Sequence, residues 1–318
     1  PYLDLGLMPL SNNLMNEAQE IAPRYPLKVM LCEKCGLSQL SIVVDPETLF
    51  GHYVYRSSIS QGYKDHCRQM AETLRDRYGL DAETFHIDIA GNDGALLAEF
   101  KKVLGHNTLT IDPAKHLVDI CEAPGVRVFN TFWGMDAARH LLSTSWPLPK
   151  LITATNVFAH VDNVAEFLDA IKAVLRPDGV AVIEFPYLKD FIEKNEFDTV
   201  YFEHLSYFSI FPLAVLCAKR GLILQDVTHH DIHGGSVRCH VTRTGQQSEQ
   251  VKAYIKAELD GGYDKLPVYK TWAAKIAWVL GDFMALVARL NSEGKKVAGF
   301  AASAKGNTLL NAAGMGAK

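Results

Sequence analysis

Strand patterns alternate with helix patterns through the middle of the chain, and this order constrains the fold more than any other feature. Strands are predicted by apolar, β-branched stretches at residues 85–94, 108–113, 126–130, 151–161 and 180–186. Amphipathic stretches that predict helices cover residues 66–79, 95–105 and 164–179. Such alternation predicts an α/β protein with a doubly wound, Rossmann-like parallel sheet. Ligands of these sheets bind at the carboxyl ends of the strands, so we look there for the site.

The pattern of predicted secondary structure divides the chain into three regions. Residues 1–65 are turn-rich, residues 66–245 carry the alternating pattern, and residues 246–318 are long and helical before a closing strand, turn and helix. We therefore predict three domains with these boundaries.

Composition narrows the classes of function. The 318 residues are 48% hydrophobic with a formal net charge of −4, and they contain no basic block or apolar run of membrane-spanning length. These features argue against nucleic-acid and membrane partners, so we expect a soluble, cytoplasmic protein. Of the six cysteines only Cys32 and Cys35 are closely spaced, which does not resemble a disulfide framework.

The turn after the first strand reads DIAGNDG, residues 88–94. It departs from the dinucleotide pattern because Ala90 stands where a glycine is expected, although Asp112 ends the next strand where a carboxylate can accept both ribose hydroxyls. The acidic Asp88 and Asp93 disfavour a pyrophosphate and suit a positively charged nucleoside cofactor, S-adenosylmethionine. An ordinary turn with a solvated aspartate is the alternative. The residues that we expect around the cofactor are Asp88, Ala90, Gly91, Asn92, Asp93, Gly94, Asp112 and Asn156.

An ordered set of short motifs carries a family resemblance over nearly the whole chain. The motifs are CEKCGLSQL, YVYRSSIS, DIAGNDGALL, ATNVFAHV, EFPYL, FDTVYFEHLSYFS, HGGSVR and ASAKGNTLLN, in that order. The sequence resembles the class I S-adenosylmethionine-dependent methyltransferases that act on sugar nucleotides, in particular the deoxysugar C-methyltransferases. The resemblance implies a small N-terminal zinc-binding domain, a central methyltransferase domain and a C-terminal Rossmann-like domain.

The sequence departs from the family pattern at three places. The family usually has glycine at the position of Ala90. Its zinc site uses two C-x2-C pairs, of which only Cys32 and Cys35 stand here, so the first ligand pair is absent and a structural zinc is an open possibility. A histidine such as His52 or His66 could complete the site, although the spacing does not support it. The C-terminal domain is expected to be truncated, because relatives continue beyond the last motif.

The stretch TVYFEHLSYFS, residues 199–209, is the candidate for proton chemistry. It reads as a strand or a strand entering a loop, and Tyr207 and Phe208 are expected in the core. Carbon methylation beside a ketone needs a base, donors for the developing oxyanion and alignment with the methyl group. His204 has an ordinary pKa near neutrality, which suits a base at cellular pH. The resemblance carries over the same assignments and implies catalytic roles for Tyr55, His160, Tyr201, Glu203 and His204, with capping of the next helix as the alternative for His160.

Two further segments are candidates for substrate binding. His233 and Arg238 in HHDIHGGSVR can contact a nucleotide diphosphate, because arginine matches phosphate geometry. The turn with Ser303, Lys305 and Asn307 can hold a phosphate through backbone N–H groups and one ammonium.

These observations favour a C-methyltransferase that acts on a nucleotide-linked 4-keto deoxysugar as a monomer. The alternatives are an O- or N-methyltransferase for a small molecule, which would not need an enolate-forming base, and a non-catalytic nucleotide-binding module.

Overall fold

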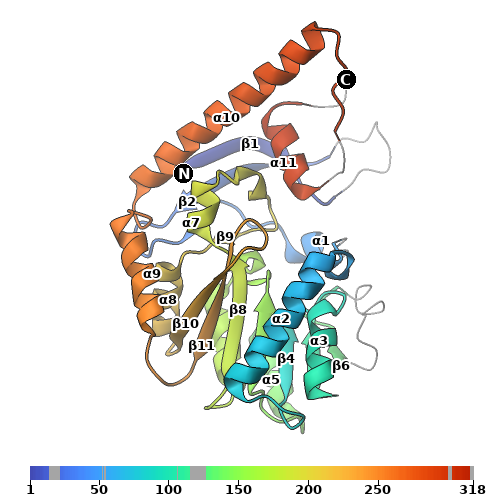
Figure 1. Ribbon diagram of the computed structural model, residues 1–318, viewed down its shortest axis with the longest axis vertical. Coiled ribbons are helices and arrows are strands. Elements are labelled where there is room, and N and C mark those ends of the chain that lie inside the picture. The colour runs from blue at the N-terminus through green and yellow to red at the C-terminus, as the bar shows by residue number, and fades with distance from the viewer. Residues whose placement is uncertain are drawn as a thin grey trace.

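The computed structural model describes residues 1–13, 22–51, 53, 55–105, 107–114, 127–299 and 303–315. Its centre is a seven-stranded sheet in the order β10-β11-β8-β7-β4-β5-β6, with the five strands from β8 to β6 parallel and β11 and β10 added antiparallel (Figure 1). The bounds are β4 His86–Ile89, β5 Thr108–Ile111, β6 Arg127–Phe129, β7 Leu151–Thr155, β8 Val180–Pro186, β10 Ile223–His230 and β11 Ser236–Thr242. The five predicted parallel strands are confirmed. The order in which the chain adds strands reverses at β4, since β5 and β6 lie on one side of it and β7 and β8 on the other, and such folds bind ligands at this point.

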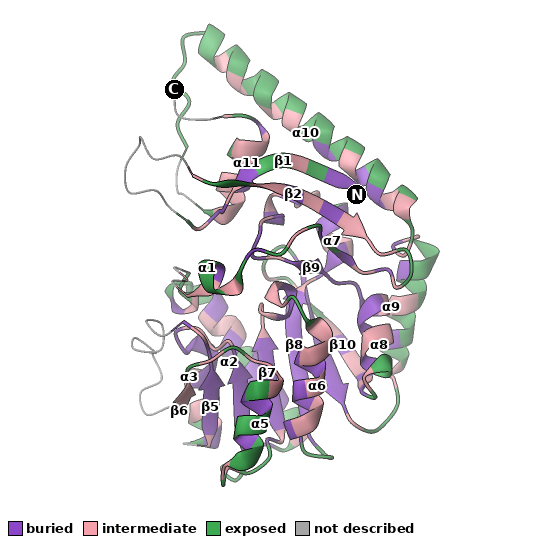
Figure 2. Ribbon diagram, turned by 180° about the vertical axis from the view of Figure 1, so that it is seen from behind, coloured by how far each residue is buried: buried purple, intermediate pink, exposed green. Residues whose placement is uncertain are grey.

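Helices cover both faces of this sheet (Figure 2). On one face lie α2 Gln61–Tyr78 and α3 Ala95–Leu104, and on the other lie α5 Met135–Ser143, α6 Val164–Val174 and α8 Ile210–Lys219. The predicted end of α2 is confirmed, since Gly79 closes the helix in the left-handed conformation at φ 55°. Buried side chains on these helices, such as Met70, Phe100 and Phe167, fill the two layers against the sheet.

A second sheet lies above the carboxyl ends of the parallel strands. It contains β1 Leu3–Pro9, β2 Arg24–Leu31, β3 Ser38–Leu40 and β9 Ser206–Tyr207, all antiparallel. Its core also takes side chains from α7 Leu188–Glu193, η3 Phe197–Thr199 and α10 Leu266–Ser292. One hydrophobic core contains side chains from all three predicted segments. The packing therefore does not mark the domain boundaries at residues 65 and 245, and these boundaries stay predictions.

The C-terminal third is helical, as predicted for residues 246–295. It contains α9 Glu249–Asp260, α10, and α11 Ala304–Ala312. Of the predicted closing strand, turn and helix, the structure describes the helix; residues 295–299 form no strand, and residues 300–302 lie outside the described part. Among the described residues, no helix combines the length and the apolar character needed to cross a membrane.

The stretch 199–209 differs from the predicted strand. Only Ser206–Tyr207 pairs, with β3, and the preceding residues form a turn that follows η3. Val200 and Phe202 are fully buried and fix this turn, while Tyr201 and His204 point to the other side. The predicted core positions of Tyr207 and Phe208 are confirmed.

Candidate active site

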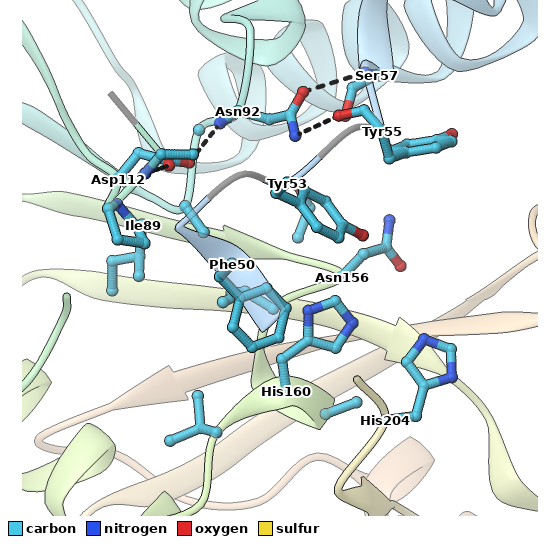
Figure 3. Close-up of a pocket in the computed structure, with 18 of the residues that line it drawn as sticks. Phe50, Tyr53, Tyr55, Ser57, Ile89, Asn92, Asp112, Asn156, His160 and His204 are labelled. Carbon is cyan, nitrogen blue, oxygen red and sulfur yellow. Dashed lines mark hydrogen bonds between the residues drawn. The ribbon is translucent and has the colours of Figure 1, made fainter. Parts of the chain in front are cut away.

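A cavity of about 780 Å³ opens where the carboxyl ends of β4, β5 and β7 face the N-terminal sheet. Its lining joins the glycine turn after β4 to the polar cluster at residues 199–204, two segments that are far apart in sequence (Figure 3). This volume lies within the range of ligand sites that enclose a small molecule.

The turn after β4 forms a close-fitting cradle at one end of the cavity. Gly91 has no room for a side chain, because a Cβ there would collide with the Thr110 hydroxyl and lie 3.0 Å from Asp88 Oδ2. Ala90 and Asn92 take left-handed backbone conformations, at φ 56° and 54°, which non-glycine residues adopt at a cost. The alanine thus keeps a backbone shape that glycine adopts more easily, and the backbone stays open to a ligand.

Asp112 lies at the end of β5, beside this turn, and is 4% exposed. Its carboxylate accepts the backbone N–H of Asn92 at 2.9 Å and of Ala114 at 2.8 Å. The carboxylate therefore orders the turn and borders the cavity at the place predicted for a ribose.

Residues 55–58 of the N-terminal region cross the turn that follows β4. Asn92 accepts the N–H of Ser57 at 3.1 Å and donates to the carbonyl of Tyr55 at 3.1 Å, as Figure 3 shows. Asp93 and Gly94 lie behind the cavity lining: Asp93 accepts the N–H and the hydroxyl of Ser58, at 3.1 and 2.7 Å. These bonds hold Tyr55 over the cavity next to the cofactor turn.

Asp88 is a buried carboxyl at the floor of the cavity. Burial raises its pKa to about 7, the charge of Asp112 adds to the rise, and the hydrogen bond from the Thr153 hydroxyl, 2.6 Å, opposes it. It therefore changes charge near neutrality, beside the proposed position of a cationic cofactor.

At the other end of the cavity, four rings form a continuous stack that brings three distant segments together. The ring of Phe50, on α1 Pro46–Phe50, stacks on His160 at 5.4 Å, and His160 stacks on His204 at 5.1 Å. Tyr201 lies 4.1 Å from the His204 ring on its far side. His160 belongs to the short helix η2 Phe158–His160 after β7, and its ring lies in this stack. The alternative that it caps the next helix is not observed, because Asn163 caps α6.

The orientation of His204 determines which nitrogen is basic. Nδ1 lies 2.8 Å from the carbonyl of Thr199, so this nitrogen carries the hydrogen and Nε2 keeps the lone pair. Burial lowers the pKa of His204 to about 4, and burial together with the charge of His204 holds the pKa of His160 well below its usual range. The expected near-neutral pKa of His204 is thus wrong for the free protein, because the imidazole is removed from water. Its Nε2 is consequently unprotonated at neutral pH.

Phenol groups and one carboxyl surround this stack. Burial raises the pKa of Tyr201 and of Tyr55, so both keep their protons and can donate hydrogen bonds. Glu203 is 1% exposed, and burial raises its pKa as well. Its side chain lies behind the lining, where Asn12 donates a hydrogen bond to it at 2.8 Å.

The predicted substrate residues separate into two groups. His233, Ser303 and Lys305 line the cavity together with Asn156, and His233 and Asn156 both have positive φ. Arg238 is 3% exposed and pairs with Glu184 at 2.8 Å, outside the lining.

The position of Arg238 argues against the predicted diphosphate contact, because its charge is already neutralised inside the protein. Asn307 also lies outside the lining, one turn into α11, where it accepts from Asn311.

Sequence reasoning missed several lining residues. Among them are Asn12, Phe50, Tyr53, Tyr63 and Thr155. Tyr53 stands in the same YVYRSS motif as Tyr55, so its proximity was available as a signal. Asn12 and Phe50 carry no local pattern, and only the folding of the N-terminal sheet brings them to the cavity.

The two clustered cysteines do not form a complete metal site with other described side chains. Cys32 and Cys35 lie in a turn between β2 and β3, and the part of the chain that the structure describes contains no group of three or more histidine, cysteine or acidic residues able to hold a metal. His66 pairs instead with Glu184 at 2.6 Å, and His52 lies outside the described residues. Since a structural zinc takes four ligands, two thiols do not fit one by themselves, and no catalytic step involves them.

Comparison with known proteins identifies the family. Three family models match in succession: "Putative zinc binding domain" at residues 1–50, "Methyltransferase domain" at residues 63–227 and "C-methyltransferase C-terminal domain" at residues 231–318. The C-methyltransferase NovU of Streptomyces niveus is 31% identical over 319 residues, which cover 99% of this chain and 76% of NovU.

Two solved structures show weaker likeness. Magnesium protoporphyrin IX methyltransferase of Synechocystis, with bound S-adenosylmethionine, is 9% identical over 57% of this chain and 80% of that one, with a TM-score of 0.43. An S-adenosylmethionine-dependent methyltransferase of Clostridium acetobutylicum is 10% identical over 57% and 92%, with a TM-score of 0.45. Both likenesses are too low to add to the assignment, which depends on the three family models and on NovU. The chain belongs to the family of S-adenosylmethionine-dependent C-methyltransferases.

Proposed function

We propose that this protein transfers a methyl group to the carbon next to the ketone of a nucleotide-linked 4-keto deoxysugar. One observation carries the proposal: an imidazole with a fixed, unprotonated Nε2 lies among phenols in the same cavity as the cofactor turn. A carbon beside a ketone becomes a nucleophile only after it loses a proton. An imidazole whose Nε2 is unprotonated at neutral pH can accept that proton, and its lowered pKa makes it a weaker base than an ordinary histidine. Methyl transfer to oxygen or nitrogen would not require this base.

The cradle fits S-adenosylmethionine. Gly91 lets the turn pack closely against Thr110 and Asp88 where it lines the cavity, and we assign Asp112 as the carboxylate for the ribose hydroxyls. Asp88 supplies negative charge to a cationic ligand when it is ionised. Held by these residues, S-adenosylmethionine would supply an electrophilic methyl group for the substrate carbon and would leave as the neutral thioether.

The residues of the ring stack divide the remaining work. His204 Nε2 takes the proton from the substrate carbon, and the enolate oxygen that forms accepts hydrogen bonds from the hydroxyls of Tyr201 and Tyr55. The resulting imidazolium lies 4.1 Å from the Tyr201 ring and stacks on His160, and the face of a phenol attracts a cation. This attraction offsets part of the burial that favours the neutral imidazole.

The start of α11 supports a phosphate-bearing substrate. Ser303 caps the helix, Lys305 lies in its first turn, and both line the cavity. An ammonium and helix N–H groups suit the diphosphate of a nucleotide sugar. His233 lies near this end, and we assign it to the substrate as well. Action as a monomer in the cytoplasm stays a prediction.

Replacement of the base tests the proposal. His204→Asn should lower turnover roughly 10²- to 10⁴-fold, and solvent deuterium exchange at the substrate carbon, measured with S-adenosylhomocysteine, should slow in parallel. Affinity for S-adenosylmethionine should change little, because the cradle lies at the other end of the cavity. His140→Asn, on the exposed side of α5, is the matched control.

Normal exchange in His204→Asn would place the base elsewhere, with His160 and Glu203 as the next residues to test. Turnover that is unchanged as well would favour methyl transfer to oxygen or nitrogen. If the wild-type protein transfers no methyl group to any keto-sugar nucleotide, the result would favour the alternative of a non-catalytic nucleotide-binding module.

A further inference from the structure

Asn12 joins the N-terminal sheet to the polar cluster at residues 199–204. It follows β1 in a turn, and its Nδ2 donates to Glu203 Oε1 at 2.8 Å across 191 positions of sequence. The same side chain lines the cavity beside Tyr201 and His204. Neither the family comparison nor the sequence motifs assign it a role.

Glu203 depends on this contact. The carboxyl is almost completely buried, and its Oε2 has no hydrogen-bond partner among the residues that the structure describes. Its recorded polar contacts are the Asn12 amide and its own backbone N–H. A buried carboxyl with so few partners is held in one orientation by the bonds that it does make.

The orientation of Glu203 matters because of its neighbours in the chain. It stands between Tyr201 and His204 in a turn that is anchored by the buried Phe202. A shift of the Glu203 carboxyl into the cavity would place an acid beside the imidazole of His204. It would also change the positions of the His204 and Tyr201 rings. A displacement of about 1 Å at such a site is enough to reduce turnover substantially.

We propose that Asn12 is a positioning residue of the methyl-transfer site, which acts by holding the Glu203 carboxyl behind the His204–Tyr201 pair. This inference rests on the proposed function. In this proposal the N-terminal sheet contributes to catalysis, in addition to any structural metal that the N-terminal domain binds. Asn13 offers a matched control, because it is the adjacent asparagine but is exposed and lies outside the lining.

The experiment uses the whole chain and compares Asn12→Ala, Asn12→Asp and Asn13→Ala. Asn12→Asp keeps the size of the side chain, removes the amide donor and places a carboxyl beside Glu203, so it breaks the hydrogen bond without opening a cavity. Loss of a hydrogen bond to a charged group corresponds to roughly a 10-fold to 100-fold effect, and we expect both Asn12 variants to lower kcat by about that much. The KM and the dissociation constant for S-adenosylmethionine should stay within twofold, and Asn13→Ala should match the wild type.

A double-mutant cycle shows whether Asn12 acts through Glu203. In a Glu203→Ala background, the additional change Asn12→Ala should alter kcat less than twofold, because the partner is already gone. Full additivity of the two changes, or a wild-type kcat in Asn12→Asp, would overturn the inference. An unfolded Asn12→Ala protein leaves the isosteric Asn12→Asp to decide. His204→Asn, assayed in parallel, distinguishes failure of the proposed function from failure of this inference. If His204→Asn loses turnover while the Asn12 variants remain fully active, only the role of Asn12 is rejected.

Discussion

The burial of His204 makes a quantitative prediction about the pH dependence of methyl transfer. Burial lowers its pKa from the ordinary 6.5 to about 4, which corresponds to roughly 3 kcal/mol in favour of the neutral imidazole. At pH 5.5 about 97% of such a histidine is neutral, compared with about 9% for one with an ordinary pKa. We therefore expect kcat/KM for the sugar nucleotide to stay almost constant from pH 7.5 down to pH 5.5, whereas an ordinary histidine would reduce it about tenfold.

The assay measures transfer of a labelled methyl group at saturating S-adenosylmethionine and limiting sugar nucleotide. Saturation matters because Asp88 titrates near pH 7 and is expected to affect cofactor binding. An acid limb centred near pH 6.5 would refute the reasoning, because it would show that water reaches the imidazole before substrate binds. The same limb in Asp88→Asn would exclude that carboxyl as its source.

Folding requires a separate control over this pH range. The pKa of His204 is depressed in the folded state, so between pH 6.5 and pH 4 the unfolded chain binds more protons than the folded chain. The stability that depends on the neutral imidazole is therefore present above pH 6.5 and is lost as the pH falls toward 4. His160 shifts in the same direction and adds to the loss. Circular dichroism at each pH, and recovery of activity on return to pH 7.5, would distinguish unfolding from titration of the base.

Three other predictions concern the cofactor cradle and the metal. Asp112→Ala should weaken S-adenosylmethionine binding at least tenfold in calorimetry, about 1.4 kcal/mol, because it removes the ribose acceptor and the bond that orders the turn. Gly91→Ala should also reduce affinity, since the new Cβ meets the Thr110 hydroxyl, and Thr110→Ala should partly restore it. Any bound metal should be zinc on Cys32 and Cys35, detected by elemental analysis, and its removal by a chelator should leave the chemistry at His204 intact.

Each of these predictions has a result that would contradict it. Unchanged affinity in Asp112→Ala would remove that carboxylate from the site, and the exposed Asp136→Ala serves as its control. Normal affinity in Gly91→Ala would show that the close packing of Gly91 on Thr110 does not determine the shape of the cofactor site. A metal held by His229, His230 or His233 would overturn the assignment to the cysteines.

The sequence predicted the central sheet because its strands are short, apolar and separated by clear helices. A buried parallel strand such as β8 has an apolar run that is visible locally. The pairing of β9 with β3 is different, since it joins two residues to a strand more than 160 positions away. No periodicity marks such a contact, so residues 199–209 are predicted as a strand or a strand entering a loop, and the sequence does not indicate that they share a core with the N-terminal sheet.

The site shows the same division. Its catalytic residue types were visible in one short stretch and in the family motifs, and the structure brings His160, Tyr201 and His204 into one stack. Two properties depend on packing and were not predictable. Burial determines the pKa of His204, and chain folding determines which cation reaches the cavity, so Lys305 lines it while Arg238 pairs with Glu184.

The most direct test of the account identifies the atom that receives the methyl group. The protein would be incubated with S-adenosylmethionine that carries a ¹³C-labelled methyl and with nucleotide-linked 4-keto deoxysugars, and the products would be examined by ¹³C NMR and mass spectrometry. We predict a gain of one labelled methyl on the ring carbon beside the ketone, shown by carbon–carbon connectivity, and formation of this product roughly 10²- to 10⁴-fold more slowly by His204→Asn. A labelled methyl on oxygen or nitrogen, or transfer at the wild-type rate by His204→Asn, would contradict the account.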